Sequence, residues 1–159
     1  MKSLTLIVAF FSILLSINLQ ADMKKLRFQT VDANKTLLFQ TGTNKNSCAI
    51  CGMHLQTFYK TSHLSDTKNG PKQYCSLHCV VADADFFENL QVIDINSLKY
   101  ISVTKAFYVV GSKKSATMSR ISKYAFSTKQ EAKEFAKEFG GEVMEFDGAY
   151  SVAKKDFMQ

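Results

Sequence analysis

The sequence has few of the residues that mark chains without a packed core. One proline and seven glycines occur among 159 residues, which excludes collagen-like, proline-rich and low-complexity disordered chains. Beyond the N-terminal segment no apolar run approaches the length of a bilayer span, and no five consecutive residues are basic. Apolar residues make up 46% of the chain, so we expect a folded protein with one domain or two tightly coupled halves.

The N-terminal segment has the pattern of a secretory signal peptide. Lys2 precedes the uncharged apolar run 4–15, and Ala21 offers a small residue for cleavage. We expect residues 1–21 to be a cleaved signal peptide and residues 22–159 to form a single exported domain. The alternative is an uncleaved anchor helix, which the shortness of the uncharged run disfavours. After cleavage no stable membrane span is expected.

The net charge of +6 is spread along the chain rather than gathered in one stripe. Nucleic-acid binding usually needs a basic stripe with aromatic side chains for stacking. We therefore expect no nucleic-acid partner, and interpret the positive residues as a solvated surface suited to an acidic partner.

The four cysteines lie close together as two pairs, Cys48 with Cys51 and Cys75 with Cys79. Disulfides in an exported domain are usually spread along the chain, whereas two close pairs about 20 residues apart are typical of one tetrahedral metal site. The spacing C-x2-C-x23-C-x3-C therefore predicts a four-thiolate site for Zn(II) or Cu(I). Two disulfides remain the alternative.

The elements around the cysteines suit a treble-clef metal knuckle. Gly52 allows a tight turn behind Cys51, and residues 58–65 and 72–75 are expected to form a hairpin. Ser76 is a plausible N-cap for a helix over 77–88. Knuckle, hairpin and helix start would then supply all four ligands.

The rest of the chain predicts a second unit of strands and a helix. Residues 129–139 have apolar positions at helical spacing, a possible cap at Ser127 or Thr128, and a stop at Gly140. Strands are expected at 92–95, 100–103, 106–111 and 142–147, and the tail 150–159 has no clear pattern. The predicted fold class is α+β, with two small β-β-α units over about 48–90 and 91–147.

Several of these segments together resemble the NosL family. They are Cys48-Ala49-Ile50-Cys51-Gly52-Met53, Phe58-Tyr59, Ala106–Gly111, Met118, and Tyr124–Thr128 continuing through Phe135–Val143. The resemblance implies a fold similar to organomercurial lyases, a periplasmic location and Cu(I) as cargo. It also implies a copper-accepting partner, since NosL proteins are accessory proteins thought to deliver Cu(I) to nitrous oxide reductase or its maturation complex.

The chain departs from typical family members in three ways. It lacks the lipid-modified cysteine near the N-terminus, and Met118 lies in Ala-Thr-Met-Ser instead of Gly-Pro-Met-Gly. This chain also has Cys75 and Cys79, a second cysteine pair that is absent from many members. The sequence therefore resembles a four-cysteine branch of the family.

Soft donors near the cysteines favour Cu(I), which prefers thiolate, thioether and imidazole ligands. We expect Met53, His78 and Met118 to join Cys48, Cys51, Cys75 and Cys79 as metal ligands. Met144, on an alternating strand, is expected to fill the core. His54 and His63 are weaker ligand candidates.

Enzymatic functions are not expected. A thioredoxin-like oxidoreductase would place its Cys-x-x-Cys at a helix start after a strand and use a cis-proline elsewhere, but the single proline, Pro71, is expected in a turn. No nucleophilic triad, phosphate loop or catalytic carboxylate pair can be assembled. A structural zinc module that recruits a partner, or less favourably a thiol–disulfide redox protein, remains as the alternative to a copper chaperone.

Overall fold

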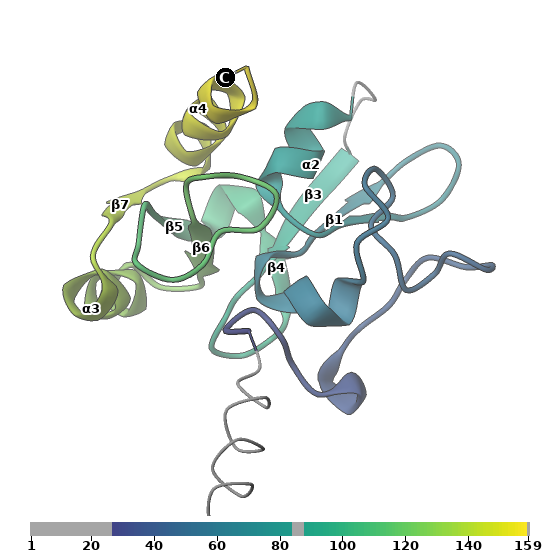
Figure 1. Cartoon of the computed structure of the whole chain (residues 1–159), viewed down its shortest axis with the longest axis horizontal. Helices are drawn as coiled ribbons and strands as arrows, with labels where there is room; N and C mark the ends of the chain where they lie inside the picture. Colours follow the sequence, from purple (N-terminus) through teal and green to yellow (C-terminus); the bar gives the residue numbers. More distant parts are fainter. Residues whose placement is uncertain (1–26, 84–87, 159) are drawn as a thin grey trace, which may run out of the picture.

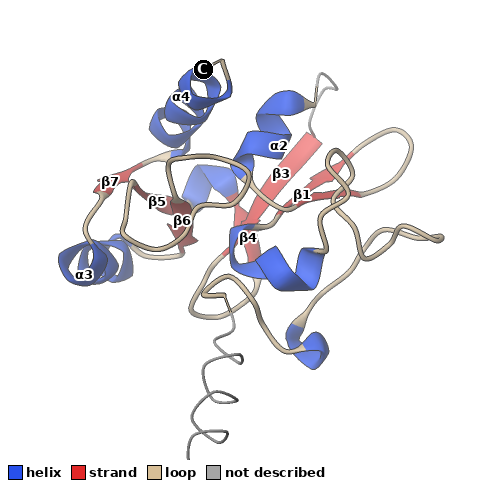
Figure 2. Cartoon of the chain, viewed as in Figure 1, coloured by secondary structure: helices blue, strands red, loops and turns tan. Residues whose placement is uncertain are grey.

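Short runs of β-branched and aromatic residues form two small antiparallel sheets in the computed structural model, which describes residues 27–83 and 88–158 (Figures 1 and 2). The predicted α+β class is confirmed, and the expected signal peptide, residues 1–21, lies outside the described residues. The strands are β1 His63–Asp66, β2 Lys72–Tyr74, β3 Glu88–Ile93, β4 Tyr100–Ser102, β5 Phe107–Val110, β6 Lys123–Phe126 and β7 Glu142–Met144. The helices are α2 Leu77–Ala82, α3 Lys129–Phe139 and α4 Phe146–Phe157, with 3-10 segments η1 Ala33–Lys35, η2 Leu55–Thr61 and η3 Val103–Lys105.

The first sheet has the strand order β2-β1-β3-β4. β1 and β2 form the predicted hairpin, with His63 opposite Tyr74. The prediction that its first strand begins at residue 58 is wrong, because that segment belongs to η2. η2 is a 3-10 segment with a kink at Phe58, and it buries Leu55 and Tyr59, each 0% exposed.

α2 is shorter than the predicted helix over 77–88. It ends at Ala82, and Asp83 turns the backbone into an extended conformation. The Asp83 carboxylate accepts hydrogen bonds from Lys72 and from the Tyr74 hydroxyl. These bonds keep Asp83 next to β2. Because β3 and β4 continue the first sheet, that sheet reaches Ser102 instead of ending near residue 90.

The second sheet has the order β6-β5-β7, with Val109 of β5 between Tyr124 and Val143. α3 follows β6 and is capped by Thr128, one of the two predicted caps, whose side chain accepts a hydrogen bond from the Glu131 N–H. The helix packs on all three strands of this sheet. Thus each half of the chain contains two antiparallel strands followed by a helix.

The C-terminal segment forms α4, which the sequence analysis did not predict. The expected strand over 142–147 is wrong beyond Met144, where β7 ends. Ala149 and Ala153, both 0% exposed, lie one helical turn apart. Their small side chains let α4 pack closely against α2 (Figure 1).

The two sheets share one core. The Ile95 N–H, just beyond the end of β3, donates to the Ala125 carbonyl at 3.1 Å and joins the first sheet to β6. A single cluster of buried side chains contains Tyr74 and Val92 from the first sheet and Tyr108 from the second. Within the described ranges, 27–83 and 88–158, no helix is long and apolar enough to cross a membrane.

Candidate metal centre

Backbone hydrogen bonds fix the knuckle that carries the first cysteine pair. The Cys48 N–H donates to the Met53 carbonyl at 2.8 Å, and the Gly52 N–H donates to the Cys48 carbonyl at 3.0 Å. Gly52 has a φ of 74°, a left-handed conformation that favours glycine. The Ala49 N–H donates to the Gln73 carbonyl at 2.9 Å, which attaches the knuckle to β2 next to the second pair.

The second cysteine pair lies where β2 passes into α2. Cys75 follows the last residue of β2, and Cys79 lies on the first turn of α2. Ser76 is the N-cap residue as predicted, but its side chain makes no capping hydrogen bond. Its carbonyl instead accepts from the Cys79 N–H at 3.1 Å, which turns Cys79 back toward Cys75.

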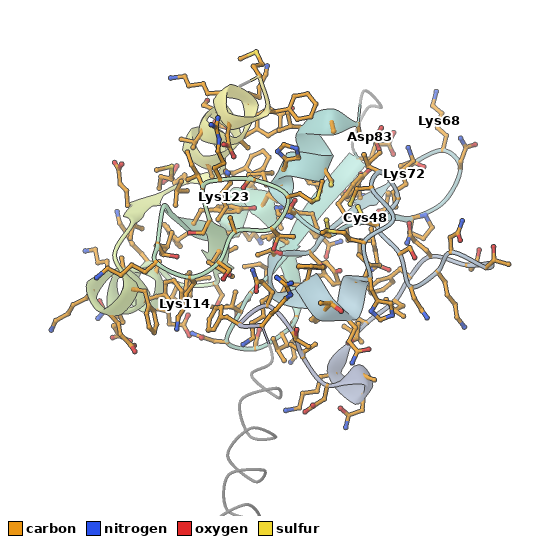
Figure 3. All side chains as sticks on the ribbon, viewed as in Figure 1. Cys48, Lys68, Lys72, Asp83, Lys114 and Lys123 are labelled. Carbon is orange, nitrogen blue, oxygen red and sulfur yellow. The ribbon has the colours of Figure 1, made fainter. Side chains whose placement is uncertain are left out.

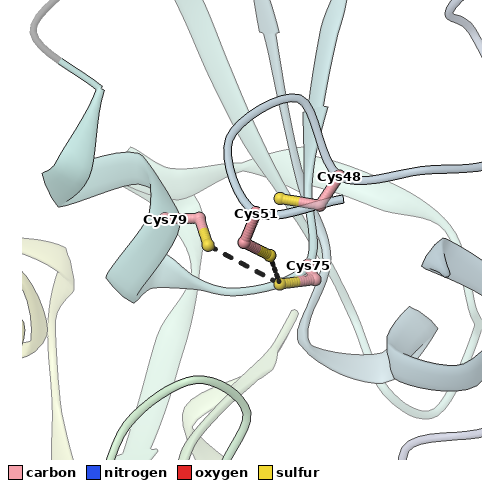
Figure 4. A group of neighbouring side chains, drawn as sticks. All are labelled: Cys48, Cys51, Cys75 and Cys79. Atoms are coloured by element: carbon pink, nitrogen blue, oxygen red, sulfur yellow. Dashed lines mark hydrogen bonds between the residues drawn. The ribbon is translucent and has the colours of Figure 1, made fainter. Parts of the chain in front are cut away.

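The four cysteines, called here the cysteine tetrad, converge on one point (Figure 4). All four sulfur atoms lie within 4.8 Å of one another. The Cys51 and Cys75 sulfurs are 3.5 Å apart, and those of Cys75 and Cys79 are 3.7 Å apart. Tetrahedral thiolate ligands about 2.3 Å from a metal have sulfurs about 3.8 Å apart. The geometry therefore fits one tetrahedral ion, and all four cysteines are free thiols in place of two disulfides.

Most of the cysteine tetrad is buried in the shared core. Cys48, Cys75 and Cys79 are 4%, 0% and 1% exposed, and Cys51 is half-buried. Contact with the sulfur of Cys48, then with that of Cys79, together with burial, raises the pKa of the Cys75 thiol. Hydrogen bonds from Cys75 and Cys79 lower the pKa of Cys48. One thiolate thus suppresses ionisation of its neighbours, and a bound cation would relieve that repulsion.

The three other predicted ligands lie in different settings. Met53 is half-buried and packs with Cys51 against the core. His78 is half-buried on α2, its ring 5.0 Å from that of Phe157. Its Nδ1 is buried and has no hydrogen-bond partner within the described part of the chain. Met118 is 39% exposed and has a φ of 53°.

A small cavity connects His78 with the loop that carries Met118. This loop, residues 112–122, is called the Met118 loop. The cavity has a volume of about 10 Å³, and its lining includes His78, Thr117 and Ser119, so it can hold about one water molecule. Thus the structure brings His78 and the two neighbours of Met118 together, while Met53 lies on the knuckle.

The two weaker candidates differ in accessibility. His63 is 1% exposed, and its ring nitrogens lie 3.0 Å from the Thr61 carbonyl oxygen and 3.2 Å from the Tyr108 hydroxyl. Both nitrogens therefore have partners, which makes His63 a structural residue. His54 is exposed at the start of η2, where it forms an isolated bridge with Ser47.

The Met118 loop is held by residues that were not predicted from the sequence to have a role in the site. Lys123, with a side chain 4% exposed, lies inside the molecule (Figure 3) and donates to the Ile121 carbonyl at 2.8 Å. Its ammonium group also lies 3.5 Å from the Asp156 carboxylate of α4. On the other side of the loop, the Thr117 hydroxyl lies 2.9 Å from that of Thr61. No sequence motif marks these residues, because their partners are 33 and 56 positions away.

The fold and the tetrad together define a small α+β protein built around four clustered cysteines that could hold one metal ion. The chain belongs to the NosL family, whose family model matches residues 40–151. A similar solved structure is that of the copper chaperone NosL from Shewanella denitrificans, with 23% identity and a TM-score of 0.54. The match covers 71% of this chain and 94% of that chain. No curated protein matches this sequence.

Proposed function

We propose that this protein is a metallochaperone that binds Cu(I) and delivers it to a copper-accepting enzyme. The observation that carries the proposal is the convergence of four free cysteines, with Met53 packed against the same core cluster and His78 next to Cys79 on α2, in a chain of the NosL family. Thiolate, thioether and imidazole groups are the ligands that Cu(I) prefers. The structure similar to this one in fold is itself named a copper chaperone.

The accessibility of the donors suits transfer. A chaperone must hold Cu(I) with few ligands, so that a ligand of the acceptor can join before the old ones leave. Met118 is 39% exposed, and Cys51 is the most accessible cysteine of the tetrad. His78 contributes an imidazole nitrogen that has no other partner among the described residues. These donors supply the ligands that an incoming acceptor can replace.

The acceptor in this proposal is a nitrous oxide reductase, or its maturation complex, in the periplasm. The family membership supports the acceptor, and the pattern of residues 1–21 supports export. Delivery by ligand exchange requires no covalent chemistry in the chaperone. We therefore assign no catalytic residue and expect no enzymatic activity.

The methionines provide the test, because a zinc site does not need thioethers. Met53→Leu with Met118→Leu nearly preserves side-chain volume and is expected to cost little stability. Cu(I) affinity, measured in competition with a chromophoric chelator under reducing conditions, should fall about tenfold or more. Met144→Leu is the matched control, since Met144 lies on β7 and packs against the core. Unchanged affinity in the double variant would contradict the ligand assignment and favour a structural zinc module.

A further inference from the structure

We propose that three basic side chains, Arg27, Lys60 and Lys114, form a docking surface for an acidic segment of a partner protein. These three residues are called here the basic patch. The chemistry of the partner follows from the patch itself. That this partner is the copper acceptor rests on the proposed function.

The fold brings the basic patch together from three separate parts of the chain. The Lys60 N–H donates to the Gln29 carbonyl at 3.1 Å, which lays the segment with Arg27 against η2. The Gln29 side chain, 0% exposed, donates to the carbonyl of Ser115 at 2.7 Å, next to Lys114. Gln29 therefore links all three parts. Charges that are spread along the sequence lie in one region of the folded protein.

Aromatic rings hold two of the cations in place. The Lys60 ammonium group lies 4.4 Å from the centre of the Phe28 ring, and the Lys114 ammonium group lies 4.7 Å from the same centre. Lys114 is also 3.7 Å from the centre of the Phe139 ring. Phe28 itself packs edge-on against Tyr124 of β6, with ring centres 5.3 Å apart. Because a ring face attracts a cation, the positive charges are positioned before a partner arrives.

The basic patch has no internal counter-charge. None of its three cations pairs with a carboxylate among the residues that the structure describes. Two ammonium groups close to one ring repel each other. Burial, together with the charge of Lys114, lowers the pKa of Lys60. Arg27 is exposed, and its guanidinium group lies 5.8 Å from the centre of the Phe58 ring. A carboxylate supplied from outside would relieve this repulsion.

The surroundings of the basic patch favour a protein segment over a lipid surface. Proteins that lie on a bilayer bury an apolar face among the headgroups. The rings of the patch, Phe28, Phe58 and Phe139, are all half-buried. The exposed large apolar side chains of the described ranges lie elsewhere, at Leu37, Leu38, Phe39, Ile50, Met118, Phe157 and Met158. The patch thus offers charge without an apolar anchor.

The spacing of the cations suits an extended acidic segment. Carboxylates on alternate residues of such a segment lie about 7 Å apart. One segment can therefore contact both ammonium groups that share the Phe28 ring. Contacts of this kind steer a partner to one face of the protein and set the rate of encounter.

The experiment is calorimetric titration of the reduced protein with octaglutamate at low ionic strength, with octaglutamine as the neutral probe. We expect octaglutamate alone to bind, and added salt to weaken the binding. Arg27→Gln with Lys60→Gln should lower the affinity about tenfold. Arg27→Lys with Lys60→Arg keeps both charges and should retain the affinity. Arg27→Gln alone changes an exposed residue, which leaves the core intact, and should lower the affinity about threefold.

Lys45→Gln with Lys68→Gln is the matched control, because it removes the same charge from two exposed residues. Lys68 and Lys114 lie on opposite sides of the molecule (Figure 3). The control should lower the affinity about twofold or less. Equal losses in the two double variants would overturn the proposal, since the peptide would then respond to net charge alone. Binding to phosphatidylglycerol vesicles without binding to octaglutamate would overturn it in favour of a lipid surface.

Cu(I) affinity in the same variants separates the basic patch from the chaperone function. The patch supplies no metal ligand, so both double variants should bind Cu(I) as the unchanged protein does. Full octaglutamate affinity in Arg27→Gln with Lys60→Gln would overturn the patch and leave the chaperone function intact. Binding of octaglutamate at the patch by a protein that binds no Cu(I) would instead overturn the chaperone function and support the patch.

Discussion

At the scale of single residues, burial distinguishes a structural histidine from a ligand. His63 lies among the cysteines in sequence, yet its side chain is enclosed between Thr61 and Tyr108. Burial lowers the pKa of His63 to about 4. The folded protein therefore keeps this imidazole neutral under conditions in which the unfolded chain would protonate it.

This difference in pKa predicts how stability depends on pH. Below the ordinary pKa of 6.5, His63 is protonated in the unfolded chain. In the folded protein it stays neutral until the pH falls to about 4. The contribution of His63 to stability is complete above pH 6.5 and is lost as the pH falls, at up to about 1.4 kcal/mol per pH unit. Urea unfolding between pH 7 and 4 measures the slope.

The control for this prediction is His63→Gln, which removes the titrating group. Acid also releases metal from thiolates, but it does so in both proteins, so the difference between their slopes isolates His63. Equal slopes in the two proteins would show that His63 does not resist protonation in the folded state.

At the scale of elements, α4 holds the Met118 loop through one buried ion pair. The Asp156 carboxylate lies 3.5 Å from the Lys123 ammonium group, and their side chains are 2% and 4% exposed. Asp156 also lies 3.6 Å from the Arg120 guanidinium. The second half of the chain thus supports the loop both from β6 and from the C-terminal helix.

Breaking this pair is expected to destabilise the fold. Asp156→Ala leaves the buried Lys123 without a carboxylate and should lower the free energy of unfolding by about 3 kcal/mol. Lys123→Met with Asp156→Leu replaces both charges by apolar groups and should recover most of that loss. Urea denaturation of the three proteins measures both effects. A double variant less stable than Asp156→Ala would show that the pair itself is strongly stabilising.

The sequence predicts elements well where the pattern is local. The close spacing within each cysteine pair, the turn of the hairpin, and α3 with a cap at Ser127 or Thr128 were all predicted from signals within a few residues. α4 was missed although Ala149 and Ala153 have helical spacing, because the preceding segment Glu142–Phe146 alternates like a strand. The length of α2 was overestimated because its end depends on Asp83 bonding to Lys72 and Tyr74 of β2, which no local pattern reveals.

At the scale of the whole molecule, the tetrad comes from the first half of the chain and is enclosed by residues of both halves. The core cluster that contains Cys48, Cys75 and Cys79 also contains Tyr108 of β5 and Ala153 of α4. Grouping of the four cysteines at one point was predicted from sequence. Their enclosure by the second half was not, because it depends on how the two sheets pack against each other.

Removal of the metal is therefore expected to destabilise both sheets together. An ion at a concentration 1,000 times its dissociation constant stabilises the folded state by about 4 kcal/mol, or roughly 10 °C in melting temperature for a chain of this size. Calorimetry with and without a strong chelator, under reducing conditions, measures the shift. Hydrogen exchange should accelerate in β5 as well as in β2. Unchanged melting with chelator present would show that the fold does not depend on the ion.

The order of the elements along the chain has a consequence for assembly. A polypeptide emerges N-terminus first, so all four cysteines become available before β5, β6 and α4 exist to cover them. The ion can enter during this early stage, while the sulfurs are still open to solvent. Once the later elements pack over Cys75 and Cys79, departure of the ion requires part of the molecule to open again. An ion that enters at this stage would load rapidly, whereas its release from the tetrad of the finished protein, in the absence of an acceptor, would be slow.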